Sequence, residues 1–161
     1  MKSILCKLFI LVGGMILIQS CGGEDPEPTP VKTPEELAIE ALTGDGMQAW
    51  GIDGGGSVER DGAVITDNYA EFELVMSSTS SKSYTSKNNN DLFDSAGTWS
   101  FAGTNFDKFI LSGTKPAADR EISFTQAGEN LKLTFTIPAP GARINGIHAV
   151  AGSYTFNLIK Q

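Results

Sequence analysis

Residues 131–137, with the sequence Leu-Lys-Leu-Thr-Phe-Thr-Ile, decide the fold because large apolar side chains alternate strictly with polar ones. A period of two is typical of an antiparallel strand that has one face on a core and the other in water. The same alternation recurs at residues 70–76 and 154–158. These stretches predict an all-β protein with an apolar interior.

Weaker strand signals fill the chain between these stretches, at residues 47–52, 58–66, 83–87, 98–102, 106–112 and 121–126. Turns are expected at Asp61-Gly62, at residues 53–56 and at residues 127–130. About eight or nine short strands without a crossover helix are typical of an antiparallel barrel or sandwich. We favour a meander that closes into a barrel of about eight strands, because closure removes unpaired sheet edges. A β-sandwich is the alternative.

A short helix is expected ahead of the strands, at about residues 34–43. The Thr33 hydroxyl can cap it, Pro34 suits the first helical position, and Glu36 can complete a capping box. Gly44 supplies the stop signal. A helix of this length is marginal alone, so we expect it to pack on a β domain that spans residues 34–161.

The first twenty residues are typical of a secretion signal. An apolar run at residues 8–18 fits the roughly 7–15-residue core of a signal peptide and is shorter than the about 20 residues of a transmembrane helix. Residues 18–21, Ile-Gln-Ser-Cys, resemble a bacterial lipobox, whose cysteine is acylated, for example with palmitate. We therefore expect a lipoprotein signal peptide at residues 1–20 and a lipidated Cys21. An ordinary secretion signal with an incidental cysteine is the alternative.

Residues 21–33 follow as a tether, because they are rich in proline and acidic side chains and have little to bury. Glu24 and Asp25 resemble the acidic export signal of Bacteroidetes lipoproteins that reach the cell surface. The expected location is the outer membrane, lipid-anchored and facing the cell surface, with the periplasmic face as the alternative.

Composition excludes several functions. The chain has 161 residues and a net charge of −7, with 12 Lys+Arg against 19 Asp+Glu, which argues against nucleic acid as a partner. Removal of Cys6 and acylation of Cys21 would leave no thiol for a disulfide or a metal. His148 is the only histidine, and Glu71 and Glu73 are expected to face solvent from one strand. We therefore predict no enzymatic activity, no catalytic residue, no metal and no cofactor.

Several segments, in their order along the chain, resemble lipocalin-like domains of Bacteroidetes lipoproteins: Phe72-Glu-Leu-Val, Gly97-Thr-Trp-Ser-Phe, Leu131-Lys-Leu-Thr-Phe and Gly152-Ser-Tyr-Thr-Phe. The likeness covers about residues 42–160. It implies a calycin-type barrel and, by analogy, binding of an apolar ligand. The lipocalin hallmark Gly-x-Trp lies mid-chain here, at residues 97–99, instead of on the first strand.

The barrel interior is the candidate ligand site. A barrel of about eight strands is either filled by its own side chains or able to hold one small ligand. Alternation predicts an inward-facing set of Phe72, Leu74, Met76, Phe124, Leu133, Phe135, Tyr154 and Phe156.

The leading hypothesis is a non-enzymatic binding module that takes a small apolar ligand into this barrel. One alternative is a structural or protein-interaction domain that binds a surface protein, with Val75 and Ile159 seeding an outer apolar patch. The other is a carbohydrate-binding accessory domain at the cell surface, with Trp50 as the best residue for stacking on a sugar.

Overall fold

The computed structural model of the chain describes residues 30–139 and 150–161. The expected signal peptide, Cys21, the tether as far as residue 29, and His148 lie outside the described residues.

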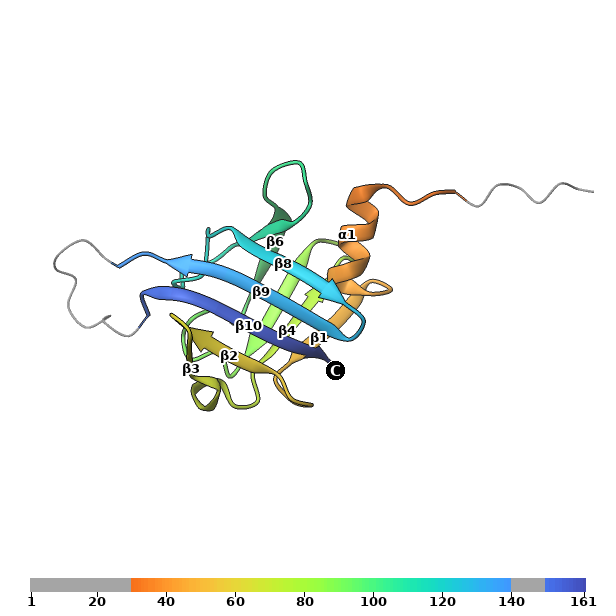
Figure 1. The fold of residues 1–161 in the computed structure, drawn as a ribbon. Coiled ribbons are helices and arrows are strands. Elements are labelled where there is room, and N and C mark those ends of the chain that lie inside the picture. The colour runs from red at the N-terminus through yellow and green to blue at the C-terminus, as the bar shows by residue number, and fades with distance from the viewer. Residues whose placement is uncertain (1–29, 140–149) are drawn as a thin grey trace, which may run out of the picture. The chain divides into compact units, whose positions relative to one another are not determined.

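One α-helix precedes the strands of the described part of the chain (Figure 1). The elements in chain order are α1 (Pro34–Thr43), β1 (Met47–Gly51), β2 (Ser57–Arg60), β3 (Ala63–Val64), the 3₁₀ helix η1 (Thr66–Tyr69), β4 (Glu73–Ser77), β5 (Ser83–Lys87), β6 (Ala96–Phe101), β7 (Lys108–Leu111), β8 (Ile122–Ala127), β9 (Asn130–Ile137) and β10 (Gly152–Lys160).

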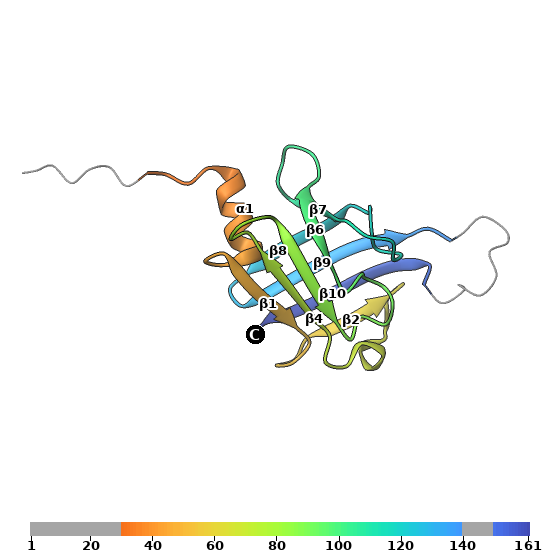
Figure 2. The ribbon, with the colours of Figure 1, turned by 180° about the vertical axis from the view of Figure 1, so that it is seen from behind.

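Eight of the strands close into an antiparallel barrel. Neighbours around the ring follow the order β1, β4, β5, β6, β7, β8, β9 and β10, and β10 pairs back to β1 through Trp50 opposite Lys160. Figure 2 shows the same ring from behind. The expected all-β barrel with one short N-terminal helix is confirmed, and the sandwich alternative is not the fold.

β1 and β2 share a partner, because β1 pairs with the end of β10 and β2 with its beginning. Between them, the Gly56 N–H donates to the Ile52 carbonyl over 2.8 Å. A Cβ atom at Gly56 would lie 2.8 Å from the Asn157 carbonyl oxygen, so only glycine fits there. We expected residues 53–56 to form a hairpin turn. Instead, they separate β1 from β2, and both of these strands pair with β10. The hairpin around Asp61 joins β2 to β3 as expected.

Helix α1 has the expected bounds and the expected cap. The Thr33 hydroxyl accepts from the Glu36 N–H over 3.2 Å, and the Glu36 carboxylate accepts from the Thr33 N–H over 2.7 Å. The helix packs on β1 and β4, and the buried Leu42 carbonyl accepts from the Trp50 indole over 2.8 Å. This contact holds α1 across the end of the barrel at which β1 begins.

The alternation that predicted β9 also describes its burial. Leu131, Leu133, Phe135 and Ile137 are buried, whereas the intervening side chains are exposed or half-buried. β4 differs from its prediction, because Glu71 has a positive φ of 59° and the strand begins only at Glu73.

Candidate functional site

The predicted interior residues all pack in the apolar core. Phe124 is only half-buried, whereas the others are at most 5% exposed: Phe72, Leu74, Met76, Leu133, Phe135, Tyr154 and Phe156. Alternation along the chain therefore predicted correctly that these side chains face inward.

Aromatic rings fill one part of this interior. The Phe156 ring lies 5.2 Å from that of Phe72, 5.2 Å from Tyr69 and 5.6 Å from Phe93, measured between ring centroids. Such separations are typical of aromatic pairs in direct contact. Phe93 comes from the loop between β5 and β6 and is 1% exposed. These contacts favour a barrel filled by its own side chains over an internal ligand cavity.

Phe124 belongs to a second aromatic group, at the end of the barrel near α1. Its ring centroid lies 5.9 Å from that of Phe109 and 6.4 Å from that of Phe101. The Lys82 ammonium lies 4.9 Å from the Phe101 ring and also donates to Glu35 of α1 over 2.8 Å. This cation therefore joins the helix to the aromatic end of the barrel.

Several surface hypotheses change with the structure. Trp50 is 2% exposed, so the carbohydrate-binding alternative loses the residue that was its best candidate for stacking on a sugar. Val75 and Ile159 lie half-buried on the outer side of their strands. Glu71 and Glu73 do not share a strand, because Glu71 precedes β4. The Glu73 carboxylate forms an ion pair with the Lys87 ammonium over 2.9 Å.

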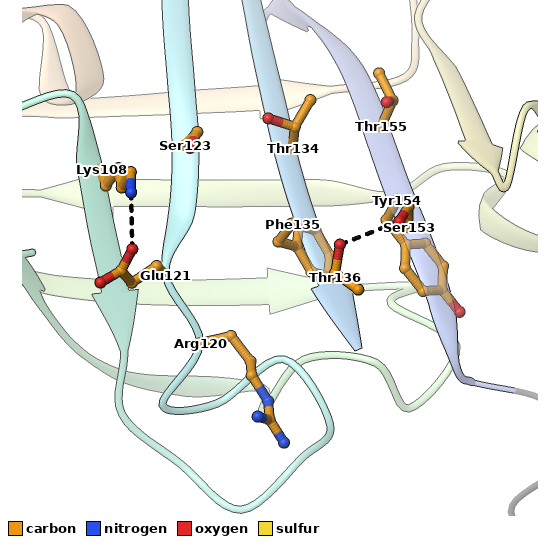
Figure 3. A pocket seen from close by; sticks show the side chains of 10 residues that line it. All are labelled: Lys108, Arg120, Glu121, Ser123, Thr134, Phe135, Thr136, Ser153, Tyr154 and Thr155. Atoms are coloured by element: carbon orange, nitrogen blue, oxygen red, sulfur yellow. Dashed lines mark hydrogen bonds and ion pairs between the residues drawn. The ribbon is translucent and has the colours of Figure 1, made fainter. Parts of the chain in front are cut away.

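An open polar groove lies instead on the outer face of β8, β9 and β10 (Figure 3). Its volume is about 510 Å³. It is lined by Lys108, Arg120, Glu121, Ser123, Thr134, Phe135, Thr136, Ser153, Tyr154 and Thr155. We call it the outer groove.

Strand register brings the hydroxyl groups of the outer groove together. Thr134 of β9 lies opposite Ser123 of β8 on one side and Thr155 of β10 on the other. Thr136 lies opposite Ser153, and their hydroxyl oxygens are 3.1 Å apart. Neighbouring strands are about 4.8 Å apart, so the hydroxyl groups form short rows across the sheet.

One row of hydroxyl groups has no hydrogen-bond partner in the part of the chain that the structure describes. Within the described residues, the side chains of Ser123, Thr134 and Thr155 make no hydrogen bond, although each is half-buried. A hydroxyl group can donate one hydrogen bond and accept others. This row can therefore bind a polar ligand without first breaking a hydrogen bond to another described residue.

Of the two cations that line the outer groove, only Lys108 forms an ion pair within the described residues. The Lys108 ammonium donates to the Glu121 carboxylate over 2.8 Å, and this hydrogen bond raises the pKa of Lys108. Arg120 is exposed and forms no ion pair or hydrogen bond within the described part of the chain. An unused guanidinium therefore lies at the groove, where its planar set of donors can bind a carboxylate in two places.

Sequence reasoning missed this groove, although part of its signal was visible. The alternation of residues 131–137 places Thr134 and Thr136 on the outer face. Arg120, Ser123 and Thr155 come from other segments, and only the pairing of β8 with β9 and of β9 with β10 brings them together.

Across residues 30–139 and 150–161, no group of three or more His, Cys, Asp or Glu side chains is placed to hold a metal ion. In the same part of the chain, no helix combines the length and the apolar character needed to cross a bilayer.

Comparisons with protein-family models, with curated proteins and with solved structures found no match to this chain. The resemblance to lipocalin-like domains of Bacteroidetes lipoproteins stays a prediction.

Proposed function

We propose that this protein is a cell-envelope lipoprotein whose β-barrel is a non-enzymatic binding module. Acyl chains on Cys21 would hold it on the outer membrane, facing the cell surface. Anchoring of this kind needs two membrane-binding signals, and a lipoprotein with several acyl chains exceeds that requirement. The lipobox-like residues 18–21 and the proline-rich tether support this part of the proposal.

The binding part of the proposal rests on the outer groove. It combines an unpaired guanidinium at Arg120 with half-buried hydroxyl groups that have no partner among the described residues. Strands hold binding groups more precisely than loops do, and β8, β9 and β10 present these hydroxyl groups from a closed barrel. The packed rings around Phe156 favour this outer face over the interior as the place where a ligand binds.

Substitution of the anchor tests the location. Cys21→Ala removes the acylation site but leaves the described barrel unchanged, so the protein should move from the membrane fraction to the soluble fraction. Globomycin, which blocks the lipoprotein signal peptidase, should make the precursor of the wild-type protein accumulate. Retention of Cys21→Ala on membranes after a high-salt wash would contradict the anchor.

Thermal unfolding tests the place of binding. A ligand that binds only the folded state raises the Tm. The full chain, solubilised in detergent, is heated with envelope polysaccharide in one series and with long-chain fatty acids in another. Because the outer groove offers hydroxyl groups and a guanidinium, we expect a higher Tm with the polysaccharide, which is polar, and this rise should be lost in Arg120→Gln. A rise with fatty acids alone would favour the barrel interior.

A further inference from the structure

The outer groove has an excess of positive charge in an acidic protein. The chain carries a net charge of −7, and five lysines are each paired with a carboxylate: Lys32, Lys82, Lys87, Lys108 and Lys115. Among the groove residues, Lys108 already neutralises Glu121, which leaves the charge of Arg120 uncompensated within the described residues. Lys132 extends this positive character, because it is exposed on the same face of β9 as Thr134. The end of the groove at Arg120 therefore attracts an anion.

The rest of the groove is suited to a ligand with many hydroxyl groups. Figure 3 shows Ser123, Thr134 and Thr155 side by side on successive strands. An apolar ligand would cover these groups without satisfying them, and a buried unsatisfied polar group is unfavourable. The rings of Phe135 and Tyr154 are at most 5% exposed, so they offer no face for stacking. A ligand must therefore bind through hydrogen bonds and charge.

Two carboxylates lie just beyond the groove lining, on the side opposite Arg120. Glu59 of β2 lies opposite Thr155, beyond β10 and away from Arg120. Asp61, also on that side, accepts from the Ser153 N–H over 2.8 Å. A carboxylate accepts hydrogen bonds from neutral hydroxyl groups and repels a second anion. The charge pattern therefore orients a ligand that is anionic at one end and rich in neutral hydroxyl groups at the other.

We propose that the outer groove binds an acidic saccharide, with a uronate carboxylate on the Arg120 guanidinium and sugar hydroxyl groups on Ser123, Thr134 and Thr155. This inference rests on the proposed function, because it names the ligand class of the same outer face. The anionic end lies at the β8 side, and the neutral end extends toward Glu59 on β2.

Calorimetric titration tests the ligand class. The full chain in detergent is titrated with a galacturonic acid trisaccharide and with its methyl ester, which has the same shape but no charge. The acid should bind about tenfold more tightly, because hydrogen bonds to a charged group contribute more than those between neutral groups. Its affinity should also fall as salt is raised, since the charges are exposed.

Matched variants test the assigned residues. Arg120→Gln should weaken binding of the acid about tenfold and leave binding of the ester unchanged. Lys160→Gln is the control, because Lys160 is also an exposed cation that forms no ion pair within the described part of the chain, but it lies at the end of β10, outside the groove. Thr134→Val, which keeps the shape and removes the hydroxyl group, should weaken binding of both saccharides.

Several results would overturn the inference. Equal affinity for the acid and the ester would remove the role of charge, and an equal loss in Arg120→Gln and Lys160→Gln would show a nonspecific charge effect. Equal binding of a glutamate tripeptide would identify an acidic peptide as the ligand class. If neither saccharide binds but Arg120→Gln still removes the Tm rise with envelope polysaccharide, the uronate is wrong and the proposed function stands. If the Tm does not rise either, both are wrong.

Discussion

The barrel interior and the outer face of β8, β9 and β10 differ in how many packing contacts and hydrogen bonds their side chains make within the protein. In the interior, the Phe156 ring contacts several other rings, and the Trp50 indole donates to the Leu42 carbonyl. On the outer face, the hydroxyl groups of Ser123, Thr134 and Thr155 have no partner among the described residues. The interior therefore stabilises the fold, whereas the outer face keeps its hydrogen-bonding capacity for another molecule.

The largest expected effect is that of Phe156→Ala, which tests whether the interior is filled. Removing a buried phenylalanine side chain costs about 3–5 kcal/mol of unfolding free energy. Urea unfolding should show a loss in this range, with Thr155→Val as the control on the adjacent outer position. A loss below about 1 kcal/mol would be too small for a packed core, and would indicate a cavity around Phe156.

A smaller effect is expected at the polar contact that closes the interior near α1. Trp50→Phe keeps most of the ring but leaves the buried Leu42 carbonyl without the indole donor. An unsatisfied buried acceptor costs about 1–3 kcal/mol, to be measured by urea unfolding. If unfolding free energy does not change, the indole hydrogen bond is not part of what holds α1 on the barrel.

Asp94 tests how a paired polar group on a loop behaves with pH. Partial burial opposes its ionisation, but hydrogen bonds from the Lys115 and Thr114 N–H groups hold the pKa of Asp94 below its usual value. Because the pKa is lower in the folded state, the carboxylate stabilises the protein above about pH 4, and this contribution is lost as the pH falls through the folded-state value.

The unfolding free energy of the wild type should therefore exceed that of Asp94→Asn at pH 6, and the difference should shrink at pH values below about 4. Asp67→Asn, at an exposed position of η1, is the control. A difference between wild type and Asp94→Asn that is constant with pH would show that ionisation of Asp94 does not contribute to stability.

The smallest effect on stability is expected at the unpaired groups of the outer groove. Arg120→Gln and Thr155→Val each remove a group with no partner in the described part of the protein, so each should change the unfolding free energy by less than about 0.5 kcal/mol. Chemical denaturation provides the measurement. A loss above about 1 kcal/mol in either variant would show that the group has a structural role.

Local signals in the sequence were sufficient for α1 and β9. The capping box of Thr33 and Glu36 and the alternation through Leu133 and Phe135 act within a few residues, so no knowledge of the fold was needed. Phe93 shows the opposite case. It lies in a polar loop without alternation, and only closure of the barrel gives it an apolar cluster to enter.

The candidate site was less accessible to sequence reasoning for the same physical reason. The predicted ligand site inside the barrel followed from alternation. Whether side chains fill that interior depends on how aromatic rings from distant segments pack against one another. The outer groove depends on strand register, which places Ser123 and Thr155 on either side of Thr134. Neither property is encoded within a single strand.

Mapping of backbone amide shifts by NMR tests most directly whether the ligand binds outside the barrel. The ¹⁵N-labelled full chain in detergent is titrated with the galacturonic acid trisaccharide. Binding in the outer groove predicts that the largest shifts occur at Arg120, Ser123, Thr134 and Thr155, with little change at Phe72, Leu133 and Phe156. Largest shifts at these interior residues, with the outer groove unchanged, would contradict it.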